Sequence, residues 1–401
     1  MSDTQKHTKL NVPNLRFPGF EGDWESCELC DIAEFSKGAG ISKDQRSSDG
    51  NPCILYGELY TTYLTEIIDE VVSKTNLDPT GLVRSKANDI IIPASGETAI
   101  DISTARCVLQ DDVLLGGDLN IIRLFNQDGR FFSYQLNGVR KKDIARIAHG
   151  VSIVHLHGNA LSHITVNYPS RSEQEKISSL LSLIDQRIAI QNKVIEKYES
   201  LIKAINKRHF KSVREDISLS SIKLSVILSE RKEYCENDGT YPHASLSKEG
   251  VDRKSERYDR DFLVRDKEKK YKVTRLNDIC YNPANLKFGV ITRNKIGPMV
   301  FSPIYVTFEI ATNYIPEYIE YYLTNPDFVR YMLKYEQGTV YERMAVSPED
   351  FLSERIKVPS LQVQHKHAAI ISSINRCLST ERKITDGLLQ LKQGILKQMF
   401  I

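Results

Sequence analysis

The feature that most constrains this chain is a long helical segment that occurs twice, at a spacing of 190 residues and without a gap. The first copy runs from Pro169 to Phe210 and the second from Pro359 to Phe400. Identical pairs include Ser170/Ser360, Gln174/Gln364, Lys176/Lys366, Ile184/Ile374, Leu201/Leu391, Ile205/Ile395 and Lys207/Lys397. Apolar positions of two amphipathic helices can match by chance. A shared Pro-Ser start and a shared terminal Phe in one frame indicate an internal repeat.

The regions in front of the two helices repeat more faintly. The matching segments are Asn88-Asp89-Ile90 with Asn277-Asp278-Ile279, Pro93-Ala94 with Pro283-Ala284, and Leu29 to Ile32 with Leu224 to Ile227. The chain is therefore organised as globule, helix, globule, helix. We expect a first globular domain at 1–168 that includes an N-terminal extension, a first helix at 169–212, a second globular domain at 213–358 and a second helix at 359–401.

The apolar positions of the first helix advance by four and three residues, with Gln191 as a polar interruption between Ile188 and Ile195. A seam this narrow suits another helix better than a sheet. We expect the two helices to pair as an antiparallel coiled coil and to act as a rigid spacer, about 57 Å long at 1.5 Å per residue. The alternative is two amphipathic helices that fold onto separate globular cores.

The second helix keeps the same frame less strictly. Its seam positions are Ile371, Ile374, Leu378, Leu388 and Ile395, with Glu381 at the place of Gln191. Thr385 and Lys392 weaken this seam. We therefore expect a second stripe through Ile384, Leu391 and Leu396 to pack as well.

The globular regions predict an α+β fold with a curved sheet. Short apolar runs of strand type are Asp89 to Ile92, Asp112 to Leu115, Leu119 to Phe125 and Pro303 to Phe308, with turns at Gly116-Gly117 and Asp128-Gly129. A helical segment is expected from Pro316 to Lys334. The fold class is thus two similar globular domains alternating with two long helices, related by a pseudo-twofold repeat.

The composition excludes several classes of protein. The 54 Lys and Arg nearly balance the 52 Asp and Glu, so any basic surface must be local. Seven Cys without regular spacing do not look like a secreted disulfide framework. No stretch approaches the roughly 18 apolar residues of a membrane helix. We expect a soluble, cytoplasmic protein without a membrane partner.

Local charge indicates nucleic acid as a ligand. Residues Arg253 to Arg275 include ten Lys or Arg and five Asp or Glu, with tyrosines between them, which suits phosphate contacts and some base contacts. The candidate DNA-binding residues are Lys37, Lys43, Tyr56, Tyr60, Thr61, Thr62, Arg253, Lys254, Arg257, Lys287 and Arg293. The alternative is a solvated charged face for the basic run and ordinary turn and strand for the other segments.

The sequence offers no credible active site. Cys27 and Cys30 form a CxxC without the second pair that a zinc ribbon needs, and His155, His157 and His163 lie without carboxylates at ligand spacing. There is no P-loop for ATP and no complete methyltransferase motif at Asn282-Pro283. Glu268 and Lys270 satisfy only half of a nuclease pattern. We expect no catalytic residue and no metal ligand.

The alternation of globular regions and long helices resembles a known family, the specificity (S) subunit of type I restriction–modification enzymes. The resemblance covers essentially the whole chain. It rests on Leu15-Arg16-Phe17-Pro18-Gly19-Phe20 with Asp23-Trp24, on Tyr56-Gly57-Glu58-Leu59-Tyr60, and on the two Pro-Ser…Gln…Lys helix starts. One departure is Gln364-His365, where the first helix has Glu173-Gln174-Glu175, so contacts with a partner subunit are expected to differ there.

The resemblance implies a function. Each globular domain would be a target recognition domain for one half of a bipartite, asymmetric site in double-stranded DNA. Two methyltransferase (M) subunits would dock on the helices, and two restriction and translocation (R) subunits would join them. S-adenosylmethionine, ATP and magnesium would belong to those partners, and this chain would be a non-catalytic subunit without a cofactor of its own. Candidate partner-binding and spacer residues are Gln174, Ile184, Gln191, Gln364, Ile374 and Ile395.

Two other classes of function stay open from the residues alone. A coiled-coil adaptor that joins proteins would need no affinity for DNA. A nuclease with a divergent site at Glu268 and Lys270 would cleave DNA in a metal-dependent manner.

Overall fold

The computed structural model describes residues 11–236, 239–248, 250–254, 270–336 and 345–401. The chain forms two compact units. The boundary between them crosses both long helices, so that about half of each helix belongs to each unit. Unit 1 is Met1–Lys193 with Lys383–Ile401, and unit 2 is Val194–Arg382. Within the ranges just given, no helix combines the length and the apolarity that crossing a bilayer requires.

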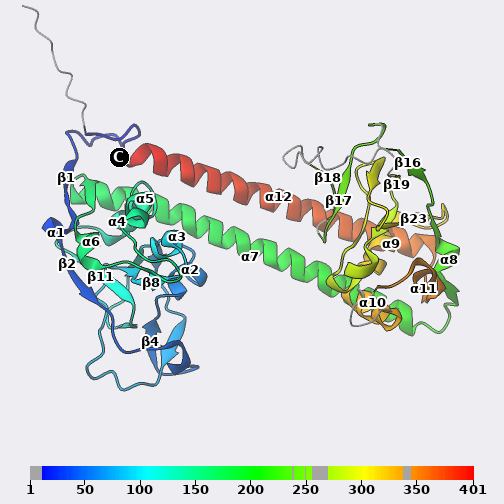
Figure 1. Ribbon diagram of the computed structural model, residues 1–401, viewed down its shortest axis with the longest axis horizontal. Helices are drawn as coiled ribbons and strands as arrows, with labels where there is room; N and C mark the ends of the chain where they lie inside the picture. Colours follow the sequence, from blue (N-terminus) through cyan, green and yellow to red (C-terminus); the bar gives the residue numbers. More distant parts are fainter. Residues whose placement is uncertain (1–10, 237–238, 249, 255–269, 337–344) are drawn as a thin grey trace, which may run out of the picture. The chain divides into compact units, whose positions relative to one another are not determined.

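Unit 1 contains the first globular region (Figure 1). Its strands are β1 (Glu25–Glu28), β2 (Ala33–Lys37), β3 (Arg46–Ser47), β4 (Asn51–Ile54), β5 (Ile67–Ile68), β6 (Ser73–Thr75), β7 (Asp89–Pro93), β8 (Ser95–Gly96), β9 (Arg106–Val108), β10 (Leu114–Leu115), β11 (Leu119–Leu124), β12 (Val154–His155) and β13 (Thr165–Tyr168). Its helices are α1 (Leu29–Ile32), α2 (Glu58–Thr61), α3 (Ala99–Ile102), α4 (Gly129–Asn137), α5 (Lys141–Arg146) and α6 (Gly158–Ser162), with a 3-10 turn η1 (Lys43–Gln45).

The main sheet of unit 1 has the strand order β2-β11-β7-β9-β5. Its central strand β7 consists of Asp-Ile-Ile-Ile-Pro and is buried on both faces. Its neighbour β11 pairs antiparallel with β7 and β2, with Ile121 opposite Ile91 and Ser36. A smaller sheet, β10-β4-β6-β3, extends from this core.

The hydrophobic core of unit 1 includes parts of both long helices. These helices are α7 (Arg171–Glu215) and α12 (Leu361–Met399). Ile177 and Leu181 near the start of α7 share one core cluster with Met399 and Phe400 at the end of α12. The helices are therefore antiparallel in this unit, and the second copy of the repeated Phe lies in the core of the first globular region.

Unit 2 contains the second globular region. Its strands are β14 (Ser221–Lys223), β15 (Leu228–Glu230), β16 (Tyr234–Cys235), β17 (Ala244–Leu246), β18 (Val251–Arg253), β19 (Tyr271–Thr274), β20 (Ile279–Tyr281), β21 (Ile291–Arg293), β22 (Met299–Phe301), β23 (Val306–Ile310) and β24 (Arg355–Lys357). Its helical segments are α8 (Leu224–Ile227), η4 (Pro283–Phe288), α9 (Pro316–Leu323), α10 (Pro326–Met332), η5 (Leu333–Tyr335) and α11 (Pro348–Ser353).

The sheet of unit 2 repeats the plan of unit 1. Its order β15-β23-β20-β21 corresponds to β2-β11-β7-β9, and the pair β14-β24 corresponds to β1-β13. The faint Asn-Asp-Ile repeat forms the same turn before the central strand in each unit. Asn88 and Asn277 both have positive φ, and Asp89 and Asp278 accept the backbone N–H three residues earlier at 2.7 and 2.8 Å. The predicted α+β fold with an internal repeat is confirmed.

The helices also pair antiparallel in unit 2. Arg382 forms an ion pair with Glu199 at 2.7 Å, and the ring of His367 stacks on that of His209 with centroids 4.0 Å apart. Phe210, the first copy of the repeated Phe, lies in the core of the second globular region. The expected antiparallel pairing is therefore present in each unit.

The segment from Pro316 to Lys334 is helical as expected, but it is divided between α9 and α10. Pro326 has no N–H to continue α9, and the Asn325 side chain instead caps the next helix by accepting the Asp327 N–H at 2.8 Å.

The expectation that a second stripe on α12 packs is wrong for two of its three residues. Ile384 and Leu391 are exposed, and only Leu396 packs against the core of unit 1. Lys392, expected to weaken the seam, is a half-buried cation that contacts Asp185 at 2.6 Å and Glu66 at 2.7 Å. A charge with two anionic partners can occupy a seam position that a lone Lys could not.

Candidate nucleic-acid interface

The start of each long helix is fastened to its globular region by the repeated glutamine. The Gln174 Oε1 atom accepts the Asp128 N–H at 3.0 Å, and its Nε2 donates to the Pro169 carbonyl at 2.8 Å and to Gln127 Oε1 at 2.6 Å. Asp128 is the N-cap of α4. The side chain of Gln174 is 0% exposed, so its amide connects helix α7 to helix α4 within unit 1.

Gln364 repeats this arrangement in unit 2. Its Oε1 atom accepts the N–H of Ile315, the N-cap of α9, at 3.1 Å, and its Nε2 donates to the Pro359 carbonyl at 2.8 Å. Both glutamines, predicted to serve partner binding or the spacer, are thus placed inside their own units. The shared Pro-Ser…Gln start of the two repeats has a structural reason.

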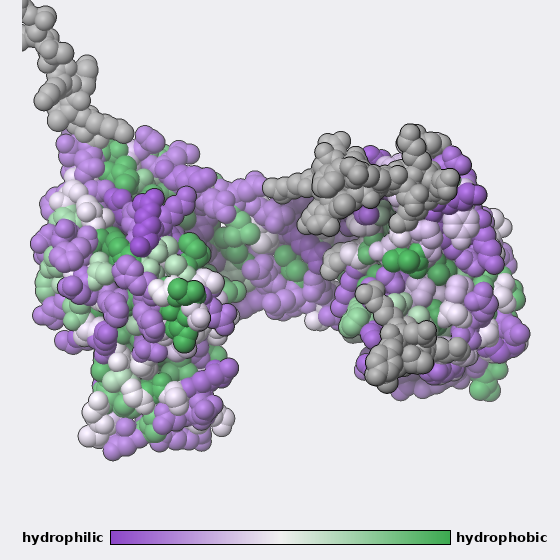
Figure 2. All heavy atoms as spheres, in the orientation of Figure 1, coloured by the Kyte–Doolittle hydropathy of each residue, from purple (hydrophilic) through white to green (hydrophobic). Residues whose placement is uncertain are grey.

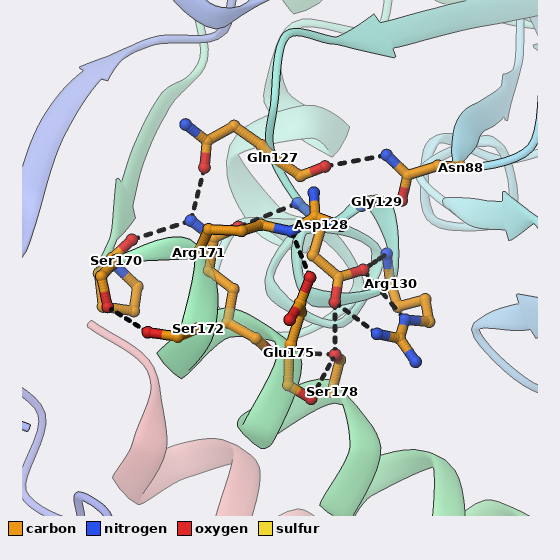
Figure 3. A network of polar contacts seen from close by, with 12 residues as sticks. Asn88, Gln127, Asp128, Gly129, Arg130, Ser170, Arg171, Ser172, Glu175 and Ser178 are labelled. Atoms are coloured by element: carbon orange, nitrogen blue, oxygen red, sulfur yellow. Dashed lines mark hydrogen bonds and ion pairs between the residues drawn. The ribbon is translucent and has the colours of Figure 1, made fainter. Parts of the chain in front are cut away.

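Further polar contacts surround the first of these junctions (Figure 3). The Asp128 carboxylate accepts hydrogen bonds from Arg130 Nη2 at 2.8 Å and from Ser178 Oγ at 2.7 Å. Burial would raise the pKa of Asp128, but the hydrogen bonds from Arg130 and Ser178 outweigh it and lower that pKa. Asn88 Oδ1 accepts the Gly129 N–H at 2.7 Å. The junction is a charged, hydrogen-bonded cluster that links α7 to the start of α4 and to Asn88.

The other predicted spacer residues lie along the helix pair. Ile184 and Gln191 are buried, Ile374 is half-buried, and Ile395 packs against the core of unit 1. These positions agree with a helix–helix seam.

A cleft of about 820 Å³ opens in unit 1 beside α2 and η1. Five of the predicted DNA-binding residues line it: Lys43, Tyr56, Tyr60, Thr61 and Thr62. Lys37 lies apart from them on the exposed side of β2. The fold thus brings together the two sequence segments that were separate candidates.

The cleft of unit 1 exposes more apolar than polar surface, and its charges nearly balance. Arg46 and Lys43 supply cations, and Glu58, Glu97 and Asp118 supply carboxylates. Glu58 is buried and holds the loop below the cleft, because its Oε2 accepts the Leu55 N–H at 2.9 Å. Burial raises the pKa of Tyr60. Hydroxyls and cations without a large net charge suit hydrogen bonds to base edges.

Unit 2 has a cleft of about 580 Å³ with a different character. Four cations line it, Lys248, Lys287, Lys295 and Arg330, against the single carboxylate of Glu320. Of these, Lys287 was a predicted DNA-binding residue. Lys287 and Arg330 also pair with carboxylates outside the lining, Glu336 at 3.7 Å and Asp327 at 3.8 Å. The cations of the lining itself suit phosphate contacts more than the cleft of unit 1 does.

The remaining candidates in unit 2 have different surroundings. Arg293 is buried and its guanidinium donates to Glu320 at 3.0 Å and to Asn277 at 2.5 Å, with Glu317 at 2.9 Å, so it holds β21 to α9. Arg253 at the end of β18 and Lys254 after it are exposed. Arg257 lies outside the described residues.

Sequence reasoning missed Arg46, Lys248, Lys295 and Arg330. None of these cations belongs to a basic run in the sequence. Within the run itself, Lys272 is buried against Glu230 at 2.5 Å and Arg275 pairs with Glu233 at 2.6 Å, so these two cations serve the unit's own packing.

The sequence matches one protein family. Residues 21–200 match the type I restriction modification DNA specificity domain. No curated protein matches the chain.

Solved structures share the fold over nearly the whole chain. The S subunit of a type I restriction–modification system from M. genitalium is similar with a TM-score of 0.64 and 16% identity, covering 97% of this chain and 99% of its own. A chain from a structure on complex assembly and conformational transition of the type I R-M system is similar with a TM-score of 0.55 and 13% identity, covering 96% and 99%.

Proposed function

We propose that this chain is a type I restriction–modification S subunit that binds a bipartite, asymmetric DNA site. Its residues 21–200 match the type I restriction modification DNA specificity domain, and its fold is that of an S subunit. It is a DNA sequence-recognition subunit of such a complex, and nothing favours the protein-only adaptor. Each globular region would recognise one half-site. We assign the recognition domains to 1–168 and 213–358 and the spacer helices to 169–212 and 359–401.

The observation that supports two recognition domains is a shared scaffold with unlike clefts. The order of the sheet strands, the Asn-Asp turn and the glutamine at the helix start recur in both units. The charges of the clefts do not: the lining in unit 1 has two cations and three carboxylates, and the lining in unit 2 has four cations and one carboxylate. A common scaffold with different contact residues is what an asymmetric site requires.

We further propose that the chain is non-catalytic and that two M subunits and two R subunits complete the complex. The M subunits would bring S-adenosylmethionine and the R subunits ATP and magnesium. The nuclease alternative rested on Glu268 and Lys270. Glu268 lies outside the described residues, and Lys270 has no function in this proposal.

Exposed apolar residues at equivalent helix positions support two copies of the docked partner. Leu201 and Leu391 correspond in the repeat, one in each unit, and are 45% and 52% exposed. Ile384 on α12 is exposed as well. Apolar patches interrupt the hydrophilic surface along the helices in Figure 2. Leucines that remain exposed on a helix pair suit an amphipathic partner helix.

The test is a methylation map. The chain is expressed with the methyltransferase encoded beside it, and modified adenines in host DNA are located by single-molecule sequencing. A split motif with a constant gap, methylated once on each strand, is expected. An unsplit motif, or modification that persists when this chain is omitted, would overturn the proposal.

A further inference from the structure

Three metal-ligating side chains from distant parts of the sequence meet on the surface of unit 1. They are Glu28, Cys30 and His163, and their ligand atoms all lie within 4.8 Å of one another. His163 Nδ1 is 2.7 Å from Glu28 Oε2, and Cys30 Sγ is 3.6 Å from the same oxygen. Among the described residues this is the one group of three such side chains so close together.

The backbone that presents these side chains is held on both sides. Glu28 ends β1, which pairs antiparallel with β13 and places Glu28 opposite Thr165. The Leu29 N–H then donates to the Ile164 carbonyl at 3.1 Å, directly beside His163. Leu29 and Ile32 of α1 are buried in the core. The backbone therefore fixes the three ligands at their Cα atoms, whereas their side-chain tips are exposed.

One of the separations between the ligand atoms already suits a tetrahedral ion. Zinc with a Zn–S bond of about 2.3 Å and a Zn–O bond of about 2.1 Å holds S and O about 3.6 Å apart, and N and O about 3.4 Å apart. The S–O separation already has this value. The N–O separation of 2.7 Å is that of a hydrogen bond, and a small rotation of the exposed His163 or Glu28 side chain would open it.

We propose that Glu28, Cys30 and His163 form a zinc site with a water molecule in the fourth position. A thiolate with an imidazole favours zinc over magnesium or calcium, which prefer oxygen ligands. On binding, the Cys30 thiol releases its proton to solvent. His163 would bind as the neutral tautomer that carries its proton on Nε2, so that the Nδ1 lone pair faces the ion.

The site would fasten together the two ends of the first globular region. Glu28 and Cys30 lie where the chain enters this region, and His163 lies just before β13, where it leaves towards α7. Cys27, the other half of the CxxC, is directed elsewhere, with its Sγ 3.9 Å from the Tyr168 hydroxyl. This role does not depend on the proposed DNA recognition.

The experiment measures alkylation rates of the cysteines in the full chain, by mass spectrometry, with and without zinc chloride at pH 7.5. Cys30 and Cys377 are both exposed, and Cys377 on α12 is a matched internal control. Zinc should slow alkylation of Cys30 at least tenfold and leave Cys377 unchanged. His163→Asn and Glu28→Gln should each remove most of this protection, whereas His157→Asn, at an exposed His six residues away, should not.

Two results would overturn the proposal. Equal protection of Cys30 and Cys377 would mean general thiol binding. Protection of Cys30 that survives both His163→Asn and Glu28→Gln would mean that a lone cysteine binds the metal. Because the methylation map does not enter this experiment, failure here leaves the recognition function untouched.

Discussion

Replacing the repeated glutamines should destabilise each unit separately. Gln174→Ala removes three hydrogen bonds and leaves the Asp128 N–H and the Pro169 carbonyl buried without partners. A buried polar group left unpaired costs about 1–3 kcal/mol. We therefore expect Gln174→Ala to lower the free energy of unfolding of unit 1 by about 3–5 kcal/mol.

Gln364→Ala should act in the same way on unit 2. It removes the two bonds to Ile315 and Pro359, one fewer than at Gln174. The loss should therefore be smaller by about 1 kcal/mol, the net value of one hydrogen bond. Gln174→Glu should lower the free energy of unfolding at least as much as Gln174→Ala, although Glu is as large as Gln, because a carboxylate cannot donate to the Pro169 carbonyl.

Hydrogen exchange followed by mass spectrometry can separate the two units, which a single melting curve would mix. Gln174→Ala should accelerate exchange in α4, and Gln364→Ala in α9. The exposed Gln186 and Gln362 are matched controls on the same two helices, and their alanine variants should stay within about 0.5 kcal/mol of the parent. If Gln174→Ala behaved like Gln186→Ala, or if the faster exchange appeared in the other unit, the structural role of the amide would be refuted.

Three further predictions concern the helices. Inserting four residues beside Gln191 adds about 6 Å of helix. In a methylation map, this insertion should change the number of base pairs between the two half-sites and leave both half-site sequences intact. An altered half-site sequence would contradict the spacer role. Leu201→Glu with Leu391→Glu should abolish co-purification of the M subunit, whereas either single variant should retain about half of it; full retention by the double variant would exclude this surface. Burial lowers the pKa of His209, and it lowers that of His367 to about 4. Because the unfolded chain binds protons that the folded chain does not, unit 2 should lose up to about 3 kcal/mol of stability as the pH falls from about 6.5 towards 4. His367→Gln should flatten that pH dependence in chemical unfolding, whereas the exposed His365→Gln should not; an unchanged slope in His367→Gln would place the pH dependence elsewhere.

Part of this structure was predictable because the repeat is a property of the sequence alone. The 4–3 spacing of apolar residues predicts the helix seam, and the two copies of Pro-Ser…Gln predict two equivalent helix starts. The Asn-Asp turn follows as well, since Asn tolerates the positive φ that Asn88 and Asn277 adopt. Periodicity and turn chemistry are local, so they need no knowledge of the partners across the fold.

The residues of the candidate interface were only half predictable. Lys43 and Thr61 were found because they belong to unusual short segments, and the structure places both in one cleft. Arg293 shows the limit of this reasoning. Its sequence neighbourhood does not reveal that Glu317, Glu320 and Asn277 surround its guanidinium. A cation on the surface and a cation in a buried network look the same in sequence.

What only the tertiary structure decided is which distant residues meet. Lys392 occupies a seam because Asp185 and Glu66 neutralise it, and Leu391 stays exposed although it belongs to an apolar stripe. Glu28 and His163 are brought together by the pairing of β1 with β13. The sequence by itself determined the repeat, the long helices and the number of globular regions. The physical reason for this division is that helix period and turn geometry depend on neighbours along the chain, whereas burial and charge pairing depend on neighbours in space.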